Sequence, residues 1–291
     1  MSVGMAWRHS ETWHFKSSMV AIGLLDVPPE SDAWRRPCQT PDDHQIAFPM
    51  RSLRTAVRGL PSRQADRVIT PMHAMFSNAG WTYTRELVDE RGERSIVFQF
   101  APEVIRSAME ANPSGFAGGV APISERLFVR QQRLYRAIRA AGQSAGEAPD
   151  PLWIEEEAAA VLHESMASGQ SPSAGAPRGD MQRADTAEFY ASAVRDALRY
   201  MEQNLHRRVS LADVGRSVRI SPAHFARIFR ANTGETIART FHQMRLRRAF
   251  MDVLDTRDSL WQIAARWGFA DLAQLSRAFA AAFGRPPSKF R

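Results

Sequence analysis

Two arginines, Arg227 and Arg277, lie fifty residues apart at equivalent positions of an imperfect internal repeat. The repeat aligns the segment 221–234 with the segment 271–284. An arginine side chain can donate paired hydrogen bonds to the N7 and O6 atoms of guanine, or to a phosphate group. A repeat of this kind indicates one supersecondary unit that is used twice. The pattern therefore predicts recognition of a nucleic acid at two places.

Each copy of the repeat follows a short segment that should also be helical, 211–218 in the first copy and 260–267 in the second. This order predicts two helix-turn-helix units whose recognition helices span about 222–232 and 272–283, and a long helix from Thr236 to Leu254 connects them. Helix-start residues support these bounds: Ser210, Ser221-Pro222, Thr236, Ser259 and Asp271. We expect the second helix of each unit to enter the major groove of DNA.

Helical geometry places a set of side chains on the exposed N-terminal faces of the two recognition helices. The candidate DNA contacts are Ser221, Ala223, His224, Ala226, Arg227, Arg230, Asp271, Leu272, Ala273, Ser276 and Arg277. The candidate phosphate contacts are Arg207, Arg208, Arg219, Arg239, Arg245 and Arg248. Surface salt bridges and solvated faces are the structural alternatives for these arginines. Alanines offer only methyl contacts to thymine, so part of the specificity should come from DNA shape.

The charge distribution favours a polyanion partner for the C-terminal third. Residues 181–291 contain 19 arginine and lysine residues against 10 aspartate and glutamate residues, whereas residues 1–180 contain 19 against 21. Arginine is nearly the only basic residue, which a GC-rich genome would also explain. The N-terminus lacks the apolar core of a signal peptide, no apolar run could span a bilayer, and Cys38 is the only cysteine. We therefore expect a cytoplasmic protein that does not bind membranes.

The chain divides into two predicted domains with a linker between them. Residues 167–188 include a stretch rich in glycine, proline and serine, which predicts a flexible linker between a domain at 1–166 and a helical domain at 189–291. Residues 45–100 alternate with a period of two and contain turn signals such as Gly59-Leu-Pro61. Helices are expected at 102–111, 124–141 and 152–167. The expected fold class is α+β, with a small antiparallel β-barrel, or alternatively a β-sandwich, that precedes the all-α domain.

The C-terminal third resembles the DNA-binding domain of the AraC/XylS transcription regulators. The resemblance rests on Ser221-Pro-x-x-Phe-x-Arg-x-Phe229, Arg245-Leu-Arg-Arg-Ala249, Ile263-Ala264, Gly268-Phe269 and Ser276-Arg-x-Phe279. It implies two recognition helices, starting near Ser221 and Asp271, in adjacent major-groove segments. Gly215 departs from the usual alanine, and Leu272-Ala273 replaces more polar residues.

The N-terminal part resembles the cupin-like sensor barrel of the same regulators. The matching segments are Asp43-His-Gln-Ile-Ala-Phe-Pro49, Asn78-x-Gly80 and Phe100-Ala-Pro102. In that family the barrel binds an effector or mediates dimer contacts. Trp81 and Tyr83 are candidate effector-pocket residues, although core packing is the more common reason for such a pair.

The histidines and the cysteine of the N-terminal part are candidates for two other site chemistries. His44 and His73 lack the further ligands that a metal site requires, so no metal or other cofactor is expected. Cys38 lies near Arg35 and Arg36, which could lower its pKa and make it a thiol sensor; an inert cysteine is the alternative.

The leading hypothesis is a sequence-specific transcription regulator that is not an enzyme and binds double-stranded promoter DNA. RNA polymerase, a small-molecule effector and a second copy of the chain are further partners left open. The alternative is a cupin-type small-molecule-binding protein or enzyme with a helical appendage.

Overall fold

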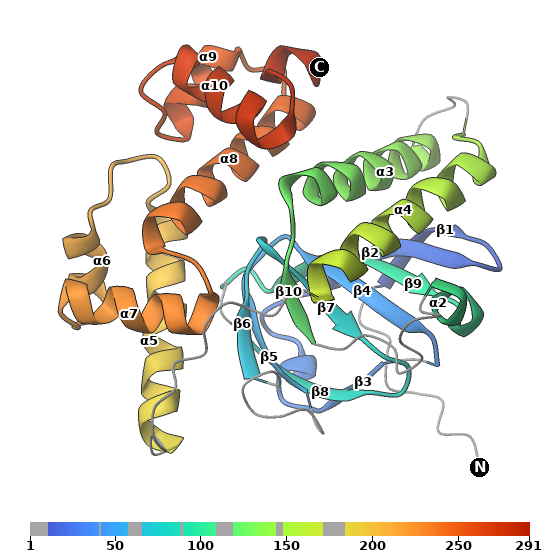
Figure 1. The fold of residues 1–291 in the computed structure, drawn as a ribbon, viewed down its shortest axis with the longest axis horizontal. Coiled ribbons are helices and arrows are strands. Elements are labelled where there is room, and N and C mark those ends of the chain that lie inside the picture. The colour runs from blue at the N-terminus through green and yellow to red at the C-terminus, as the bar shows by residue number, and fades with distance from the viewer. Residues whose placement is uncertain are drawn as a thin grey trace. The chain divides into compact units, whose positions relative to one another are not determined.

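The structure is a computed structural model that describes residues 11–40, 42–57, 66–87, 90–108, 119–143, 148–170 and 184–291. The chain forms two compact units, Met1–Pro172 and Ser173–Arg291, called here the N-terminal unit and the C-terminal unit. Antiparallel sheets and helices build the N-terminal unit, and the C-terminal unit is helical (Figure 1). The expected α+β class is therefore confirmed. Among these residues no helix is both long enough and apolar enough to cross a membrane.

The described strands of the N-terminal unit lie in two antiparallel sheets. They are β1 (Glu11–Lys16), β2 (Val20–Val27), β3 (Cys38–Gln39), β4 (His44–Pro49), β5 (Leu53–Val57), β6 (Asp66–Ile69), β7 (His73–Ser77), β8 (Thr82–Leu87), β9 (Glu93–Phe100) and β10 (Val120–Pro122). The longest strands, β2 and β9, are rich in β-branched and large apolar residues, which pack well on a pleated surface.

The expectation of one closed barrel is wrong for the described residues. One sheet has six strands in the order β1-β2-β9-β4-β7-β10, and the other has four in the order β3-β8-β5-β6. A barrel closes only if every edge strand pairs with a neighbour. Here the edge strands are β1 and β10 of the larger sheet and β3 and β6 of the smaller one, and no described strand pairs one sheet with the other.

The N-terminal unit also contains helices. They are η1 (Asp32–Trp34), α2 (Pro102–Ala108), α3 (Glu125–Gln143) and α4 (Pro151–Gln170). Helices α3 and α4 lie side by side (Figure 1), and Arg130 of α3 ties them together by ion pairs to Glu157 at 2.6 Å and Glu164 at 3.0 Å. The helix expected at 102–111 corresponds to α2, and positions 109–111 lie outside the described residues.

The C-terminal unit consists of consecutive helices. They are α5 (Ala184–Gln203), α6 (Leu211–Ser217), α7 (Pro222–Thr233), α8 (Ile237–Asp255), α9 (Leu260–Arg266), α10 (Leu272–Phe283) and η2 (Pro287–Lys289). Helix α8 buries residues around much of its circumference, among them Phe241, Leu246 and Phe250, so it forms the centre of the unit. Helix α7 packs near its start, α6 packs against α5 and α7, and α9 and α10 pack near its end (Figure 1).

Part of the predicted linker 167–188 is helical, because α4 continues through Gln170 and α5 begins at Ala184. The middle of that linker lies outside the described residues, as does the predicted turn Gly59-Leu-Pro61. The proposed domain limits 1–166 and 189–291 stay predictions.

Candidate nucleic-acid interface

Two α-helices joined by a tight turn, α6 and α7, form the first repeat. Ser210 begins α6 with a capping box, in which its Oγ accepts a hydrogen bond from the Asp213 N–H at 3.1 Å and the Asp213 carboxylate accepts one from the Ser210 N–H at 3.0 Å. These hydrogen bonds lower the pKa of Asp213. Gly215 allows the close approach of the turn, since a Cβ there would lie 2.8 Å from the Ile220 carbonyl oxygen. This contact accounts for the glycine that departs from the AraC/XylS pattern.

Arg219 occupies the turn between α6 and α7 in a left-handed conformation with φ of 57°. Among the described residues it is the only non-glycine residue with a positive φ. In the second repeat the equivalent turn position is Gly268, with φ of 69°. A residue with a Cβ is held there at a backbone cost of about 1–2 kcal/mol relative to its usual conformations. The Arg219 side chain is exposed, and the backbone conformation that holds it there is one that glycine would adopt without that cost.

The apolar side chains of α7 fix which face of the helix is exposed. Phe225, Ile228 and Phe229 are buried. Ser221, Ala223, His224, Arg227 and Arg230 are exposed, whereas Ala226 is half-buried. The structure therefore brings most of the first set of candidate contacts onto one accessible helix.

The second repeat, α9 and α10, has the same backbone plan. Ser259 begins α9 with a capping box to Gln262, and Asp271 begins α10 by accepting a hydrogen bond from the Gln274 N–H at 2.5 Å. Leu275 and Phe279 are buried, and Phe279 packs with Phe250, Phe283 and Phe290. Asp271, Leu272, Ala273 and Arg277 are exposed, and Ser276 is half-buried.

The turns of the two repeats contain equivalent backbone hydrogen bonds. The Ile220 N–H donates to the Gly215 carbonyl at 3.0 Å in the first, and the Phe269 N–H donates to the Ala264 carbonyl at 3.0 Å in the second. The first turn places four residues between its helices, Val218 to Ser221, and the second places five, from 267 to 271. The helix bounds agree with the expected 222–232 and 272–283 to within one residue.

Comparisons with known proteins agree with a helix-turn-helix assignment for this part of the chain. A family model described as "Helix-turn-helix domain" matches residues 214–291. The transposon Tn10 TetD protein of Escherichia coli is 28% identical over 107 residues, which are 37% of this chain and 78% of that protein. The HTH-type transcriptional regulator GlxA of Rhizobium meliloti is 29% identical over 133 residues, 45% of this chain. The chain spans only 38% of the length of GlxA.

A solved structure of a transcriptional regulator from Chromobacterium violaceum, described as AraC-type, is 25% identical and covers 34% of this chain and 89% of that chain, with a TM-score of 0.33. The C-terminal part of this chain is an AraC-type helix-turn-helix domain.

Two arginines of α8 in this AraC-type domain are engaged within the molecule. Arg245 donates from Nε to the Leu205 carbonyl at 2.7 Å and from a terminal nitrogen to the Arg207 carbonyl at 2.5 Å, and its guanidinium lies 4.5 Å from the centre of the Phe241 ring. Burial lowers the pKa of Arg245. Arg248 forms an ion pair with Glu202 of α5. Both side chains hold α8 against the preceding segment, so they are poorly placed for the phosphate contacts expected of them.

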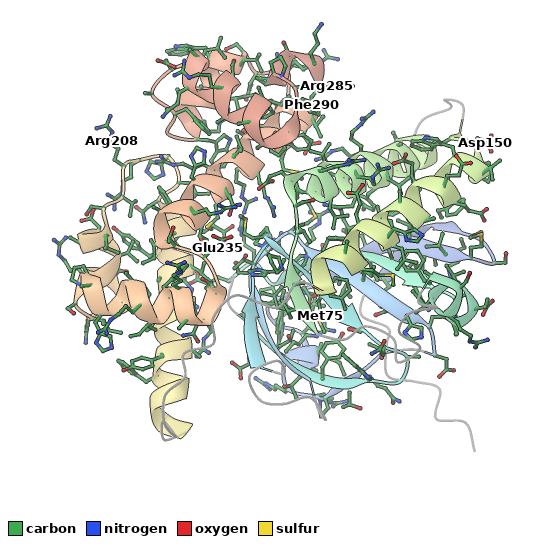
Figure 2. All side chains as sticks on the ribbon, viewed as in Figure 1. Met75, Asp150, Arg208, Glu235, Arg285 and Phe290 are labelled. Atoms are coloured by element: carbon green, nitrogen blue, oxygen red, sulfur yellow. The ribbon has the colours of Figure 1, made fainter. Side chains whose placement is uncertain are left out.

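The other candidate phosphate contacts are more accessible. Arg207 donates to the Tyr200 hydroxyl at 2.8 Å and to the Asn204 side chain at 2.6 Å, and Arg239 pairs with Glu235 at 3.1 Å on the helix surface. Arg208 and Arg219 are exposed, and Figure 2 shows Arg208 projecting away from the helices. Surface pairs of this kind contribute little to stability and exchange readily with other anions.

A second candidate site lies between the two sheets of the N-terminal unit. A cavity of about 30 Å³ has polar lining from Glu11, Gln45, Ser77, Tyr83, Arg85 and Glu93. Met75, labelled in Figure 2, also lines it, whereas Trp81 is not among the lining residues and packs beside Tyr83 on a cluster around Cys38. The structure thus places one of the two expected pocket residues at the cavity.

A buried ion pair organises this cavity. Arg85 and Glu93 lie 2.8 Å apart with side chains 3% and 6% exposed, and Arg85 also donates to the Tyr83 hydroxyl at 2.7 Å. Burial alone lowers the pKa of Arg85, but the Glu93 carboxylate reverses the direction and raises it. Burial raises the pKa of Tyr83 to about 12. The Arg85 Nε and Gln45 Nε2 atoms are buried and have no hydrogen-bond partner among the residues that the structure describes.

Sequence reasoning missed Arg85, Glu93, Gln45 and Glu11. A signal was present, because Arg85 shares a strand face with Tyr83, and a charged residue at an inward-facing strand position requires a buried partner.

The remaining candidates of the N-terminal unit have structural contacts. His44 Nδ1 lies 3.0 Å from Asn78 Oδ1, and His73 Nδ1 lies 3.0 Å from Thr70 Oγ1. No group of three or more potential metal ligands occurs among the described residues. Cys38 is buried, and that burial raises its pKa. The idea that Arg35 and Arg36 lower the pKa of this thiol is therefore wrong.

Proposed function

We propose that this protein is a sequence-specific DNA-binding transcription regulator that inserts α7 and α10 into adjacent major-groove segments of promoter DNA. The observation that carries the proposal is the repeat itself. Both copies bury the same positions of the second helix and leave Arg227 and Arg277 exposed at the same helical phase. The matching helix-turn-helix model and the named transcription regulators support DNA binding.

We infer that the connecting helix α8 sets the separation of the two recognition helices. Helix α8 contains 19 residues, which corresponds to roughly 28 Å at the rise of an α-helix. Successive major-groove segments on one face of a duplex lie about 34 Å apart. Helix α8 is also buried on much of its surface, so the separation is held by packing and not by a flexible segment.

DNA selected from a random pool by the full chain provides the test. We expect Arg227→Ala and Arg277→Ala each to weaken binding to the selected site by about 1–3 kcal/mol, because each removes a base or phosphate contact. Arg36→Ala, which removes one exposed arginine from the N-terminal unit, is the matched charge control and should bind normally. A full chain that enriches no sequence from the pool at near-physiological salt would refute the proposed function.

We further propose that the cavity between the sheets binds a small polar effector. The support is the two buried donors, Arg85 Nε and Gln45 Nε2, since buried polar groups in proteins are nearly always hydrogen-bonded. At about 30 Å³ the cavity has room for one or two water molecules. A larger effector therefore requires side chains to move, and the flexible Met75 is the residue best able to do so.

Ligand binding to the folded state raises the melting temperature, which makes thermal unfolding with a panel of small metabolites the natural assay. An effector held by Gln45 should stabilise the wild-type chain and have less effect on Gln45→Leu. The exposed Gln39→Leu variant is the control, and an equal response of both variants would exclude the cavity.

The proposal assigns no catalytic role to the chain, in keeping with the regulators that it resembles. The cupin-like character of the sheets and a contact with RNA polymerase are parts of the same hypothesis. So is a homodimer formed through α4, whose first turn exposes Leu152 (61%) and Trp153 (40%).

A further inference from the structure

The two repeats share a backbone plan, yet their exposed surfaces differ in chemistry. The first difference lies at the helix starts. Ser221 makes no side-chain hydrogen bond to the start of α7, so its hydroxyl group is available to an outside partner. Asp271, by contrast, uses its carboxylate to cap α10. A negative charge at that position repels a phosphate group, whereas an uncapped helix start attracts one.

The second difference is the distribution of charge. Helix α7 exposes His224, Arg227 and Arg230 and contains no acidic residue, and the turn before it exposes Arg219. Helix α10 contains a single charged residue, Arg277. Electrostatic attraction to the DNA backbone should therefore come mainly from the first repeat.

The third difference is the first turn of α10, which is apolar where it is exposed. Leu272 is 38% exposed, and Ala273 is exposed beside it. The neighbouring polar side chain is Gln274, whose Oε1 accepts a hydrogen bond from the Ala270 N–H at 2.6 Å, so that its amide oxygen is engaged and only its N–H groups can face a partner. An exposed leucine at the tip of a recognition helix can only make apolar contacts with a base edge, and the apolar group in the major groove is the C5-methyl of thymine.

We propose that the two recognition helices divide the work: α7 supplies most of the phosphate and guanine contacts, whereas α10, in addition to the contact made by Arg277, reads thymine methyl groups through Leu272 and Ala273. This inference rests on the proposed function, since it requires both helices to enter the major groove. It assigns an A·T-containing half-site to α10. Asp271 contributes to the same preference by disfavouring a close phosphate, which leaves base-edge contacts as the main source of recognition by this helix.

The test replaces thymine by deoxyuracil, which removes the methyl group and leaves base pairing unchanged. The full chain and its Leu272→Ser variant each select DNA from a random pool, and the half-site whose preference differs between them is the one that α10 reads. Deoxyuracil is then placed in one half-site at a time, and the dissociation constants are measured. We expect deoxyuracil in the α10 half-site to weaken wild-type binding about fivefold and to leave Leu272→Ser binding unchanged. In the other half-site, where the first turn of α7 exposes Ala223 and no leucine, any loss should be smaller and should be the same for both proteins.

Leu272→Met keeps an apolar side chain and should retain the fivefold loss, which separates the methyl contact from any change in folding. Equal melting temperatures of the three proteins complete that control. An α10 half-site without thymine, or a loss of binding that is the same for wild type and Leu272→Ser, overturns the division of work. Failure to enrich any sequence would instead overturn the proposed function, so the two failures are distinguishable.

Discussion

Replacing Arg219 by glycine should stabilise the C-terminal unit while weakening its binding to DNA. Arg219 has φ of 57°, a conformation that costs a residue with a Cβ about 1–2 kcal/mol. Glycine removes this cost, but it also increases the conformational entropy of the unfolded chain, which lowers the free energy of unfolding by about 0.4–1 kcal/mol. The expected net gain is about 0.5–1 kcal/mol. For a unit of this size that corresponds to a rise in melting temperature of about 3 °C.

The same substitution removes a candidate phosphate contact. If Arg219 neutralises one phosphate, the slope of log K against log salt concentration should fall by about 0.9 in the glycine variant. Arg219→Ala is the matched variant, because alanine keeps the Cβ and loses the charge. It should lose the same part of the salt dependence without the gain in stability.

Thermal unfolding followed by circular dichroism, together with binding to a selected site at several salt concentrations, measures both effects. A glycine variant no more stable than the alanine variant would refute the argument from backbone conformation. Salt slopes equal to that of the wild-type chain in both variants would show that Arg219 does not contact DNA.

Two further predictions concern the scaffold. Arg245→Met should destabilise the C-terminal unit by about 1–3 kcal/mol, because the Leu205 carbonyl loses its hydrogen-bond donor. Thermal unfolding measures this change, and the control variant Arg257→Met, at an exposed position, should have little effect. Leu152→Gln should weaken self-association of the chain, because it removes an exposed apolar side chain from α4; sedimentation equilibrium measures this, and unchanged association would exclude that surface.

The helices of the C-terminal unit were predictable because their signals are local. Ser210, Thr236, Ser259 and Asp271 each accept a hydrogen bond from a backbone N–H three residues later in the chain. A capping residue, an apolar period and a following glycine all lie within one helix length, so the sequence contains the whole signal.

The N-terminal unit was less predictable because its pairings are distant. Strand β9 lies between β2 and β4, so Phe98 pairs with Ile22 and with Ile46, which are far from it in the sequence. Strand β2 was not expected at all. Buried residues interrupt its alternation, because Ile22 and Gly23 are both covered. When apolar and polar residues do not alternate strictly, a short apolar run does not indicate which face of the strand will be buried.

The arginines of the candidate interface show a similar limit. Arg245 and Arg227 look alike in sequence, and both lie on helices of a basic region. Only the fold brings the Leu205 and Arg207 carbonyls to Arg245, from about forty residues earlier in the chain. Tertiary packing decides whether a guanidinium group faces solvent or donates hydrogen bonds to the backbone carbonyl groups of a loop.

The two repeats separate the positions that specify the fold from those that specify a partner. The buried positions agree in kind, since Phe225 corresponds to Leu275 and Phe229 to Phe279, and all four side chains are inaccessible. Exposed substitutions usually change stability by less than about 0.5 kcal/mol, whereas truncating a buried aromatic side chain costs about 3–5 kcal/mol. The fold therefore constrains the buried positions of the repeat strongly and the exposed positions only weakly. The contrast between a cationic α7 and an apolar first turn of α10 thus lies at positions that the fold leaves free, which is the pattern expected if, as proposed, the two helices contact different DNA sequences.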